Sequence, residues 1–264
     1  MRPPDYDLDK IKFATDKPTF EKAVGLYENG KVTRVAERFG DYSAVVLGTK
    51  PYQVSVDTRR YGYGNCTCYL GQHDTWCKHM TALAIHAVMN GKPLTDEDKK
   101  LTHNPSCSGQ LGTLSDEELP VAKKSITAAI RYIKPYIGPS RTWFAYQNSL
   151  DEGCNRLSAI VAELPVSKQT ADILVKMLLR LDKKLSYSGV DDSNGTVGGF
   201  IQEVVQILVE YAQLDKSCIK AFKPLAELDE TTCFGWEEPL AQLFEESADK
   251  IAFNHSKNNP SHIR

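Results

Sequence analysis

The sequence has no long uninterrupted run of apolar residues. A membrane-spanning helix needs about 20 mostly apolar residues, and no stretch of the 264-residue chain approaches that length. The first residues, 1–7, are polar and lack the apolar core of a secretory signal. The sequence therefore predicts a protein without a membrane partner, located in the cytoplasm, or in the nucleus if the source is eukaryotic.

The sequence also lacks the short motifs of common enzyme classes. It contains no His-Glu-x-x-His pair, no nucleophile elbow, no kinase signature and no dinucleotide fingerprint. A cysteine such as Cys154 or Cys218 would act as a nucleophile only beside a base, which the sequence does not place. We therefore expect no enzymatic activity, and an unrecognised enzyme ranks third among the hypotheses for function.

Strong charge of either sign is absent as well, since the formal net charge is −2. Residues 1–94 carry 13 Lys and Arg against 10 Asp and Glu, a formal +3, and residues 95–264 carry 19 against 24, a formal −5. Many nucleic-acid-binding domains are far more basic than this first part. The charge therefore favours a protein partner and leaves nucleic acid as the alternative.

What the sequence does contain is a compact set of metal-binding residue types within residues 65–80. Its pattern is Cys-x-Cys, eight intervening residues and Cys-x-His, formed by Cys66, Cys68, Cys77 and His79. Three thiols and one imidazole are one of the usual structural zinc sets. Four protein ligands complete a tetrahedral ion and leave no position for water or substrate. The pattern therefore predicts one structural Zn²⁺ per chain.

The spacing within the set has a geometric reason. In an extended chain, residues i and i+2 point to the same side, so Cys66 and Cys68 can direct both sulfurs at one point. Two residues along a helix point to nearly opposite sides. We therefore expect Cys77 just before a helix and His79 in its first turn. Apolar residues then follow at the spacing of three and four that is typical of a helix, namely Met80, Leu83, Ala84, Ala87 and Val88.

Other uses of the cysteines fit the sequence less well. A disulfide needs an oxidising compartment, which nothing in the sequence indicates, and an iron–sulfur cluster usually takes four cysteines. We expect the remaining cysteines to be reduced and mostly buried: Cys107, Cys154, Cys218 and Cys233. His73 and His86 lie near the set, and we expect them on the surface or around the metal ligands rather than among them.

Cys-x-Cys, a short loop and Cys-x-His leading into an apolar helix resembles the SWIM zinc finger. Residues 20–32 are similar to the short helix and first strand of that family, so the resemblance covers about the first third of the chain. It implies zinc binding by the same three cysteines and one histidine. Family members occur beside helicase-type ATPases, transposases and ubiquitin-pathway proteins. The resemblance therefore also implies binding of DNA or of proteins.

The first part of the chain reads as a small α+β domain over residues 1–94. The pattern predicts a helix over 19–29, with Thr19 as its N-cap. It then predicts three antiparallel strands, 31–38, 43–47 and 52–56. A sheet of this size is too small to be stable alone, so zinc should supply much of its folding free energy. A linker rich in Gly, Pro and Asn is expected over 95–114, with at most one helical turn.

Residues 115–264 show helical spacing of apolar residues almost throughout. Ser115 and Glu118 form a capping-box pattern, and Ser167 is placed to cap a later helix. Several helices joined by short turns predict an all-α helical bundle or a short helical-repeat domain. No fixed sequence period supports the repeat over the bundle.

Arg59, Arg60 and Lys78 flank the metal-binding set and are the candidate nucleic-acid contacts. Basic and aromatic residues beside a zinc knuckle can hold a phosphate and stack on a base. The alternative, favoured by the modest charge, is a solvated strand end with Tyr61 and Tyr63 covering the metal.

The loop over residues 190–199 contains Asp191-Asp192-Ser193 and several glycines. It resembles an Asp-Asp-Ser-x-Gly stretch in the helical region of bacterial SWIM proteins. A phosphate loop is excluded because no strand precedes it and no Gly-Lys-Ser/Thr follows, and a calcium loop would need a terminal Glu. We expect Asp192 or Ser193 to be the N-cap of the next helix.

Together these features predict a non-catalytic, zinc-binding module fused to a helical domain. Its expected role is protein–protein interaction, with nucleic-acid binding through the zinc module as the alternative.

Overall fold

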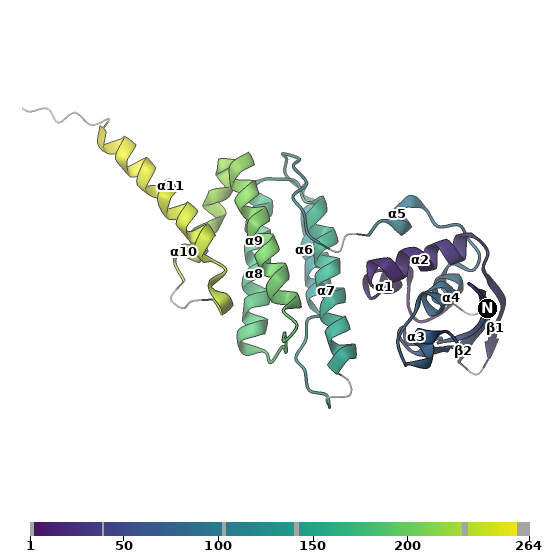
Figure 1. The fold of residues 1–264 in the computed structure, drawn as a ribbon. Coiled ribbons are helices and arrows are strands. Elements are labelled where there is room, and N and C mark those ends of the chain that lie inside the picture. The colour runs from purple at the N-terminus through teal and green to yellow at the C-terminus, as the bar shows by residue number, and fades with distance from the viewer. Residues whose placement is uncertain (1–2, 39, 102–103, 140–142, 229–231, 258–264) are drawn as a thin grey trace, which may run out of the picture. The chain divides into compact units, whose positions relative to one another are not determined.

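The computed structural model describes residues 3–38, 40–101, 104–139, 143–228 and 232–257. The chain divides into two compact units, Met1–Leu101 and Thr102–Arg264. The first combines a four-stranded antiparallel sheet with helices, and the second is helical (Figure 1). The predicted α+β class is therefore confirmed, and the predicted metal ligands lie in the first unit.

The sheet follows chain order, β1-β2-β3-β4, with antiparallel neighbours. The three predicted strands are present as β1 (Val32–Arg38), β2 (Asp41–Leu47) and β3 (Pro51–Asp57). A fourth, β4 (Gly64–Cys66), pairs with β3 and ends at the first cysteine of the predicted set. It escaped the sequence analysis because three residues are too few to show alternation.

Two helices precede the sheet, α1 (Leu8–Phe13) and α2 (Lys17–Glu28). The expected start of α2, with Thr19 as its N-cap, is corrected by the structure. Asp16 is the cap, and its carboxylate accepts the backbone N–H of Thr19 at 2.9 Å. The helix therefore begins at Lys17, because an Asp at the N-cap satisfies a free amide of the first turn. α1 was not predicted, since six residues are too short for a helical period.

The core of the first unit lies between the sheet and the helix α4 (Lys78–Met89). On β2 the buried residues alternate, Tyr42, Ala44 and Val46, because successive side chains of a strand point to opposite faces. On α4 every residue from His79 to Ile85 is buried. A helix that is buried on all sides needs neighbours on several faces, and α4 has them in the sheet and α2.

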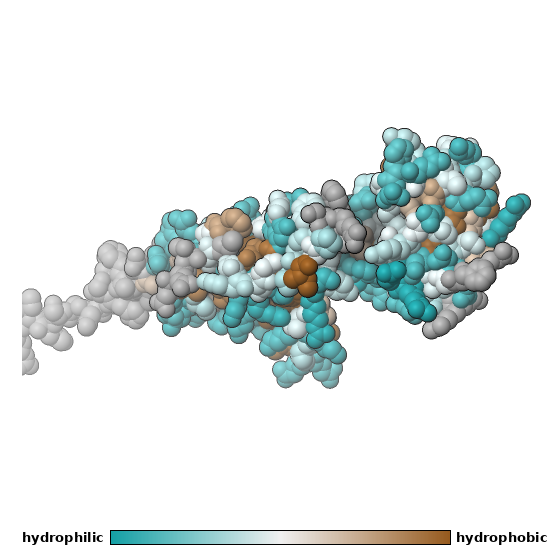
Figure 2. Space-filling model, turned by 90° about the horizontal axis from the view of Figure 1, so that it is seen from below, coloured by the Kyte–Doolittle hydropathy of each residue, from teal (hydrophilic) through white to brown (hydrophobic). Residues whose placement is uncertain are grey.

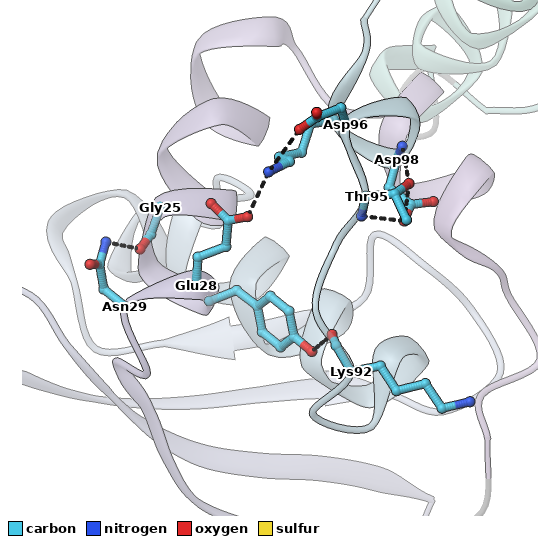
Figure 3. A network of polar contacts seen from close by, with 9 residues as sticks. Gly25, Glu28, Asn29, Lys92, Thr95, Asp96 and Asp98 are labelled. Carbon is cyan, nitrogen blue, oxygen red and sulfur yellow. Dashed lines mark hydrogen bonds and ion pairs between the residues drawn. The ribbon is translucent and has the colours of Figure 1, made fainter.

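Residues just before the expected linker and at its beginning are bound to the first unit (Figure 3). The hydroxyl of Tyr27 on α2 donates to the carbonyl of Lys92 at 2.6 Å, and the Lys99 ammonium lies 3.0 Å from a carboxylate oxygen of Glu28. A capping box starts the short helix α5 (Asp96–Lys99). The first unit therefore extends beyond residue 94, as far as residue 101.

The end of the same segment is bound to the second unit. Leu111 forms a parallel bridge with Val166, whose backbone N–H donates to the carbonyl of Gln110 at 2.6 Å. The hydroxyl of Ser108 donates to the carbonyl of Leu164 at 2.7 Å. The boundary between the units lies inside the expected linker. The residues at each end of that segment nevertheless form hydrogen bonds with the unit that they adjoin.

The second unit consists of helices around one hydrophobic core. Long helices form most of it: α6 (Glu118–Ile130), α7 (Trp143–Glu163), α8 (Lys168–Tyr187) and α9 (Thr196–Leu214). Shorter elements and a last helix follow, namely the 3₁₀ helix η2 (Lys216–Phe222), α10 (Lys223–Ala226), the 3₁₀ turn η3 (Cys233–Gly235) and α11 (Glu238–Lys257). The predicted start of α7 near Arg141 lies outside the described residues.

The hydrogen bonds predicted at two helix starts are present, although the N-cap of α6 is Glu117 rather than Ser115. Ser115 and Glu118 exchange hydrogen bonds, with the Glu118 carboxylate accepting the Ser115 N–H at 2.8 Å and the Ser115 hydroxyl accepting the Glu118 N–H at 3.2 Å. Ser167 is the N-cap of α8 and forms a capping box with Thr170. Such reciprocal bonds satisfy amides that a helix start leaves free.

The start of α9 differs in detail from the expectation. Its N-cap is Gly195, whose φ of 71° lies in the left-handed region. Asp192 still serves the helix start, because its carboxylate accepts the backbone N–H groups of Val197 at 2.9 Å and Gly198 at 2.8 Å. Asp192 is therefore a helix-capping group that acts from the preceding loop, and the assignment of the N-cap itself to Asp192 or Ser193 was wrong.

Asp191 ties the same loop to α7. Its carboxylate accepts the indole N–H of Trp143 at 2.9 Å and the backbone N–H of Ser193 at 3.1 Å. Its carbonyl accepts a hydrogen bond from Gln147 at 2.9 Å. Hydrogen-bond donors thus surround both carboxylates of the loop, and donors there leave little room for a cation.

Among the described helices, none combines the length and apolar character needed to cross a membrane. Figure 2 shows a surface that is mainly hydrophilic, with apolar areas that are small and separate. Scattered apolar residues of this kind are normal on a folded protein.

We expect mild proteolysis to cut the chain first between residues 99 and 108 and to release a stable helical fragment. Each unit has its own core, so cutting between them should leave both intact. Mass spectrometry of the fragments measures the cut sites. Loss of both units together, with no stable fragment, would contradict this expectation.

Candidate metal centre

Cys66 and Cys68 are held by the edge of the sheet. Cys66 is the last residue of β4, where it pairs with Val54, and Cys68 is the N-cap of the short helix α3 (Tyr69–Gln72). Thr67 between them exchanges hydrogen bonds with Gln53 of β3, at 3.1 Å through its N–H and 3.0 Å through its hydroxyl. The middle residue is therefore fixed on the sheet, and both cysteines are left buried and pointing to the same side, as the i, i+2 spacing predicts.

Cys77 and His79 come from the start of α4. Cys77 is the N-cap in extended conformation, with φ −132° and ψ 163°, and His79 is the second residue of the helix. This confirms the expected position of both residues. The backbone changes from extended at Cys77 to helical at His79, and this change directs both side chains to the same side. In a continuous helix, residues i and i+2 would point to nearly opposite sides.

The structure brings all four side chains together. Their ligand atoms lie within 4.8 Å of one another, and Nδ1 of His79 is 3.8 Å from both the Cys66 and the Cys77 sulfur. A tetrahedral ion with metal–sulfur bonds of about 2.3 Å and a metal–nitrogen bond of about 2.0 Å separates sulfur and nitrogen by about 3.6 Å. The separations therefore fit one ion at the centre of the group.

The four ligand residues are almost inaccessible to solvent. Their exposed fractions are 5% for Cys66, 7% for Cys68, 1% for Cys77 and 5% for His79. Three buried thiolates, the form that binds a metal, are unfavourable unless a positive charge compensates them, and a divalent cation supplies that charge. The donor set, the separations and the burial together show a group that could hold one metal ion.

Backbone amides support the sulfurs. The N–H of Cys68 donates to the Cys66 sulfur at 3.5 Å, and the N–H of Gly71 donates to the Cys68 sulfur at 3.4 Å. Donation to a thiolate favours its charged form. The turn from Cys66 to Gly71 thus supplies both the ligands and the groups that stabilise them.

Gly71 is required by the closeness of this turn. A Cβ atom on residue 71 would lie 2.3 Å from the carbonyl oxygen of Cys66 and 2.6 Å from its Cβ. Both atoms belong to rigid parts of the knuckle, so a larger residue cannot be accommodated by rotating a side chain. Glycine is therefore required at residue 71 by lack of space for a Cβ, and not by an unusual φ.

Without a metal, the thiols share their protons unequally. The hydrogen bond between Cys66 and Cys77 raises the pKa of Cys66, which burial raises further, and the same bond lowers the pKa of Cys77. The hydrogen bond with His79 lowers the pKa of Cys77 in addition. The site therefore favours a thiolate at Cys77, and metal binding would displace the proton held by Cys66.

The His79 imidazole is oriented by packing. Tyr52 of β3 stacks on it, with ring centroids 4.4 Å apart, and a Cβ on Gly48 would lie 3.2 Å from Nε2. Among the described residues Nε2 has no hydrogen-bond partner. Metal-binding histidines usually donate their second N–H to a polar group. Here an aromatic ring and a glycine backbone set the orientation instead.

A hydrogen-bond network that the sequence analysis missed holds the loop before α4. The indole N–H of Trp76 donates to the Tyr61 hydroxyl at 3.1 Å and to the Thr81 hydroxyl at 2.9 Å, and Thr81 donates to the carbonyl of Cys77 at 3.2 Å. The Tyr61 hydroxyl also hydrogen-bonds to Thr15, and burial raises the pKa of Tyr61 to about 12. The network joins segments far apart in sequence, so no local pattern reveals it.

Among the residues whose side chains the structure describes, no other histidine or cysteine belongs to the group. His73 is exposed and lies against Tyr69, with ring centroids 4.4 Å apart, and His86 lies against Tyr27 at 5.9 Å. Burial lowers the pKa of His86. Among the described residues the remaining cysteines are free thiols, Cys107, Cys154 and Cys218. The side chain of Cys233 lies outside the described residues.

The candidate nucleic-acid residues occupy different environments. Arg59 and Arg60 are exposed, and their backbone N–H groups donate to one carboxylate oxygen of Asp57 at 2.7 Å, which lowers the pKa of Asp57. The Arg60 guanidinium lies 4.3 Å from the ring centre of Tyr63. Lys78 is only half-buried, between two buried ligands. Tyr63 is exposed and Tyr61 belongs to the Trp76 network, so it is Tyr52 that packs against the metal-binding group.

A search of protein-family descriptions, of curated proteins and of solved structures found no match to this chain.

We expect Gly71→Ala to destabilise the first unit by about 1–3 kcal/mol, because the added Cβ overlaps the Cys66 backbone. Thermal unfolding monitored with bound metal measures this. Gly25→Ala is the matched control, because its Cβ in α2 meets nothing within 4 Å and alanine is the better helix former. Equal stability of both variants would contradict the close approach at residue 71.

We expect Cys77→Ser to abolish stoichiometric metal binding and to unfold the first unit, leaving most of the helical signal of the second. The reason is that metal binding supplies folding free energy to a small sheet, whereas the second unit has a separate core. Elemental analysis and circular dichroism measure the two effects. Cys107→Ser, at a free half-buried thiol, should change neither.

Proposed function

We propose that this chain is a non-catalytic binding protein in which a SWIM-type zinc module is fused to a helical domain. The observation that carries the proposal is the closed metal-binding group. Its four donors are buried and converge on one point, so an ion held there has no free position for a substrate. An ion in this position acts as a structural link between chain segments.

The choice of zinc rests on the donors. Three thiols and an imidazole in a tetrahedral arrangement are typical of structural Zn²⁺, whereas an iron–sulfur cluster would usually have a fourth cysteine. The SWIM assignment rests on the order of the elements. A short helix and a first strand precede the Cys-x-Cys turn, and Cys-x-His begins an apolar helix, as the resemblance implies.

Protein–protein interaction is the favoured role. The charge of the second unit supports this role. Residues 102–264 carry 17 Lys and Arg against 21 Asp and Glu, and a net negative charge disfavours binding of a polyanion such as nucleic acid to that unit. Free thiols at the described cysteines outside the metal-binding group agree with a cytoplasmic location, or a nuclear one in a eukaryote. An unrecognised enzyme remains the third hypothesis.

Nucleic-acid binding is the alternative, and one observation favours it. Arg60 lies over the ring of Tyr63, and Tyr63 has 54% of its surface exposed. A cation and an exposed aromatic ring can meet a phosphate and a base. Arg59 and Lys78 would add two further phosphate contacts.

Affinity capture with the full chain tests the proposed role. We expect a partner protein to be captured even after nuclease treatment. If the zinc module holds this partner, the Cys77→Ser variant should no longer capture it. The Cys107→Ser variant should still capture it. The purified protein should contain about one zinc per chain. Capture that disappears entirely with nuclease, or a protein carrying iron, would contradict the proposal.

For nucleic acid, we expect at most weak and salt-sensitive binding. Three phosphate contacts from Arg59, Arg60 and Lys78 give a log–log salt slope of about −2 to −3. Titration of labelled duplex and single-stranded DNA at two salt concentrations measures it. Tight binding that salt hardly weakens would replace the protein partner with nucleic acid as the main role.

A further inference from the structure

A third chain segment lies against the metal-binding group without supplying a donor atom. It is the hairpin formed by β2 and β3, whose turn lies at residues 48–50. Tyr52, just after the turn, pairs with Val46 and packs on the core of the first unit. Its ring is stacked on the His79 imidazole, with the centroids 4.4 Å apart and an angle of 29° between the planes. The hairpin therefore contacts one ligand residue through the face of an aromatic ring.

The imidazole of His79 presents one nitrogen to the sulfurs and the other to the hairpin turn. Nδ1 lies 3.8 Å from the sulfurs of Cys66 and Cys77, whereas a Cβ on Gly48 in the turn would lie 3.2 Å from Nε2. Nε2 is buried and has no hydrogen-bond partner among the described residues. A neutral imidazole that binds a metal through Nδ1 carries its proton on Nε2. This N–H meets the turn instead of an acceptor, so packing fixes the rotation of the ring.

The cysteine ligands are supported by the backbone. The sulfurs of Cys66 and Cys68 each accept a backbone N–H, at 3.5 Å and 3.4 Å. Cys77 lies at the N-terminus of α4, where the helix dipole favours a thiolate. The position of the His79 ring depends instead on a neighbouring side chain, which makes His79 the ligand most sensitive to a substitution nearby.

The hairpin also holds the Tyr52 ring itself. The hydroxyls of Tyr52 and Thr49 are 2.9 Å apart, and the Lys50 ammonium lies 5.8 Å from the centre of the ring, within the range of a cation–π contact. A Cβ on Gly48 would lie 3.0 Å from the same ring. All three contacts lie within the hairpin, so the position of the ring does not depend on the metal ligands.

We propose that Tyr52 is a positioning residue of the metal centre and determines how tightly the site holds its ion. Its ring takes the place of the hydrogen-bond partner that a metal-binding histidine usually has, and it keeps Nδ1 of His79 directed at the ion. Without the ring, the imidazole can rotate away from the sulfurs, and the ion loses a ligand. The inference rests on the zinc binding proposed above, and it adds the residue that controls zinc affinity.

A second stacked pair in the same unit provides the comparison. Tyr69 and His73 also have ring centroids 4.4 Å apart. Both residues are exposed, and His73 is outside the metal-binding group. The two pairs share the separation of the rings, but only one of them contains a ligand. A substitution of Tyr69 therefore controls for the loss of a tyrosine from the same unit.

The test measures the zinc affinity of the full chain by competition with a chelator of known affinity. Tyr52→Leu keeps apolar bulk but removes the ring, and it should weaken zinc binding about 10–100-fold. Tyr52→Phe keeps the ring and loses one exposed hydrogen bond, so its affinity should stay within about threefold of the unchanged chain. Tyr69→Leu, the matched control, should stay within about twofold.

Cobalt spectra separate this role from a merely structural one. With Co²⁺ in the site, Tyr52→Leu should shift and weaken the visible absorption bands, because these bands depend on the geometry of the ligands. Tyr52→Phe should leave them unchanged. A tyrosine that only stabilises the sheet would lower the unfolding temperature and leave the spectrum of the loaded protein as it is. That result overturns the inference, as does a loss of zinc affinity in Tyr52→Phe or Tyr69→Leu equal to that in Tyr52→Leu.

A measurement on the unchanged chain does not depend on the folding of any variant. Long-range proton–nitrogen NMR spectra of the zinc-loaded protein should show Nδ1 of His79 bound to the metal and Nε2 protonated. The ring protons of His79 should be shifted upfield by the stacked Tyr52 ring. A metal bound at Nε2, or ring protons without that shift, overturns the inference.

These results also distinguish the inference from the proposed function. A purified chain that binds no zinc rejects the zinc module and the role of Tyr52 together. One zinc per chain, held by Tyr52→Leu as tightly as by the unchanged chain, leaves the zinc module standing and rejects only the role of Tyr52.

Discussion

The first unit depends on the convergence of two chain segments on one point. Cys66 and Cys68 come from a strand end, and Cys77 and His79 come from a helix start, and their donor atoms meet within 4.8 Å. Few other contacts of a unit of about 100 residues could tie these ends together with comparable strength, because structural metal binding contributes about 10–16 kcal/mol in small domains. The end of the sheet, the knuckle and the start of α4 meet at this point.

Around that point, the supporting contacts are small and specific. Gly71 lets the knuckle approach the Cys66 backbone, Tyr52 holds the His79 ring, and the Trp76 network fixes the loop before α4. None of these groups donates to a metal, but each sets the position of one that does. The second unit follows a different principle, since its stability comes from a helical core and from capped helix starts such as the one served by Asp192. The core of the second unit therefore contains none of the residues of the metal-binding group.

Patterns that act over a few residues were read correctly from the sequence. The grouping of the three cysteines with His79, the position of Cys77 before α4 and the reciprocal hydrogen bonds at Ser115 and Ser167 all depend on neighbours along the chain. The predictions were wrong where an element has few residues, and where two neighbouring residues could each cap the same helix. β4 and α1 have too few residues to show a period, and Asp16 replaced Thr19 as the cap of α2. The expected linker was recognised by composition, but its hydrogen bonds to the two units were not.

The sequence by itself therefore determined the donor chemistry, the α+β class and most helix positions, because residue type and spacing control them directly. Only the tertiary structure decided that Tyr52 rather than Tyr61 packs against the imidazole and that Trp76 joins Tyr61 to Thr81. These contacts join residues that are distant in sequence. Their geometry follows from how whole helices and strands pack, and packing leaves no periodic signal in the chain.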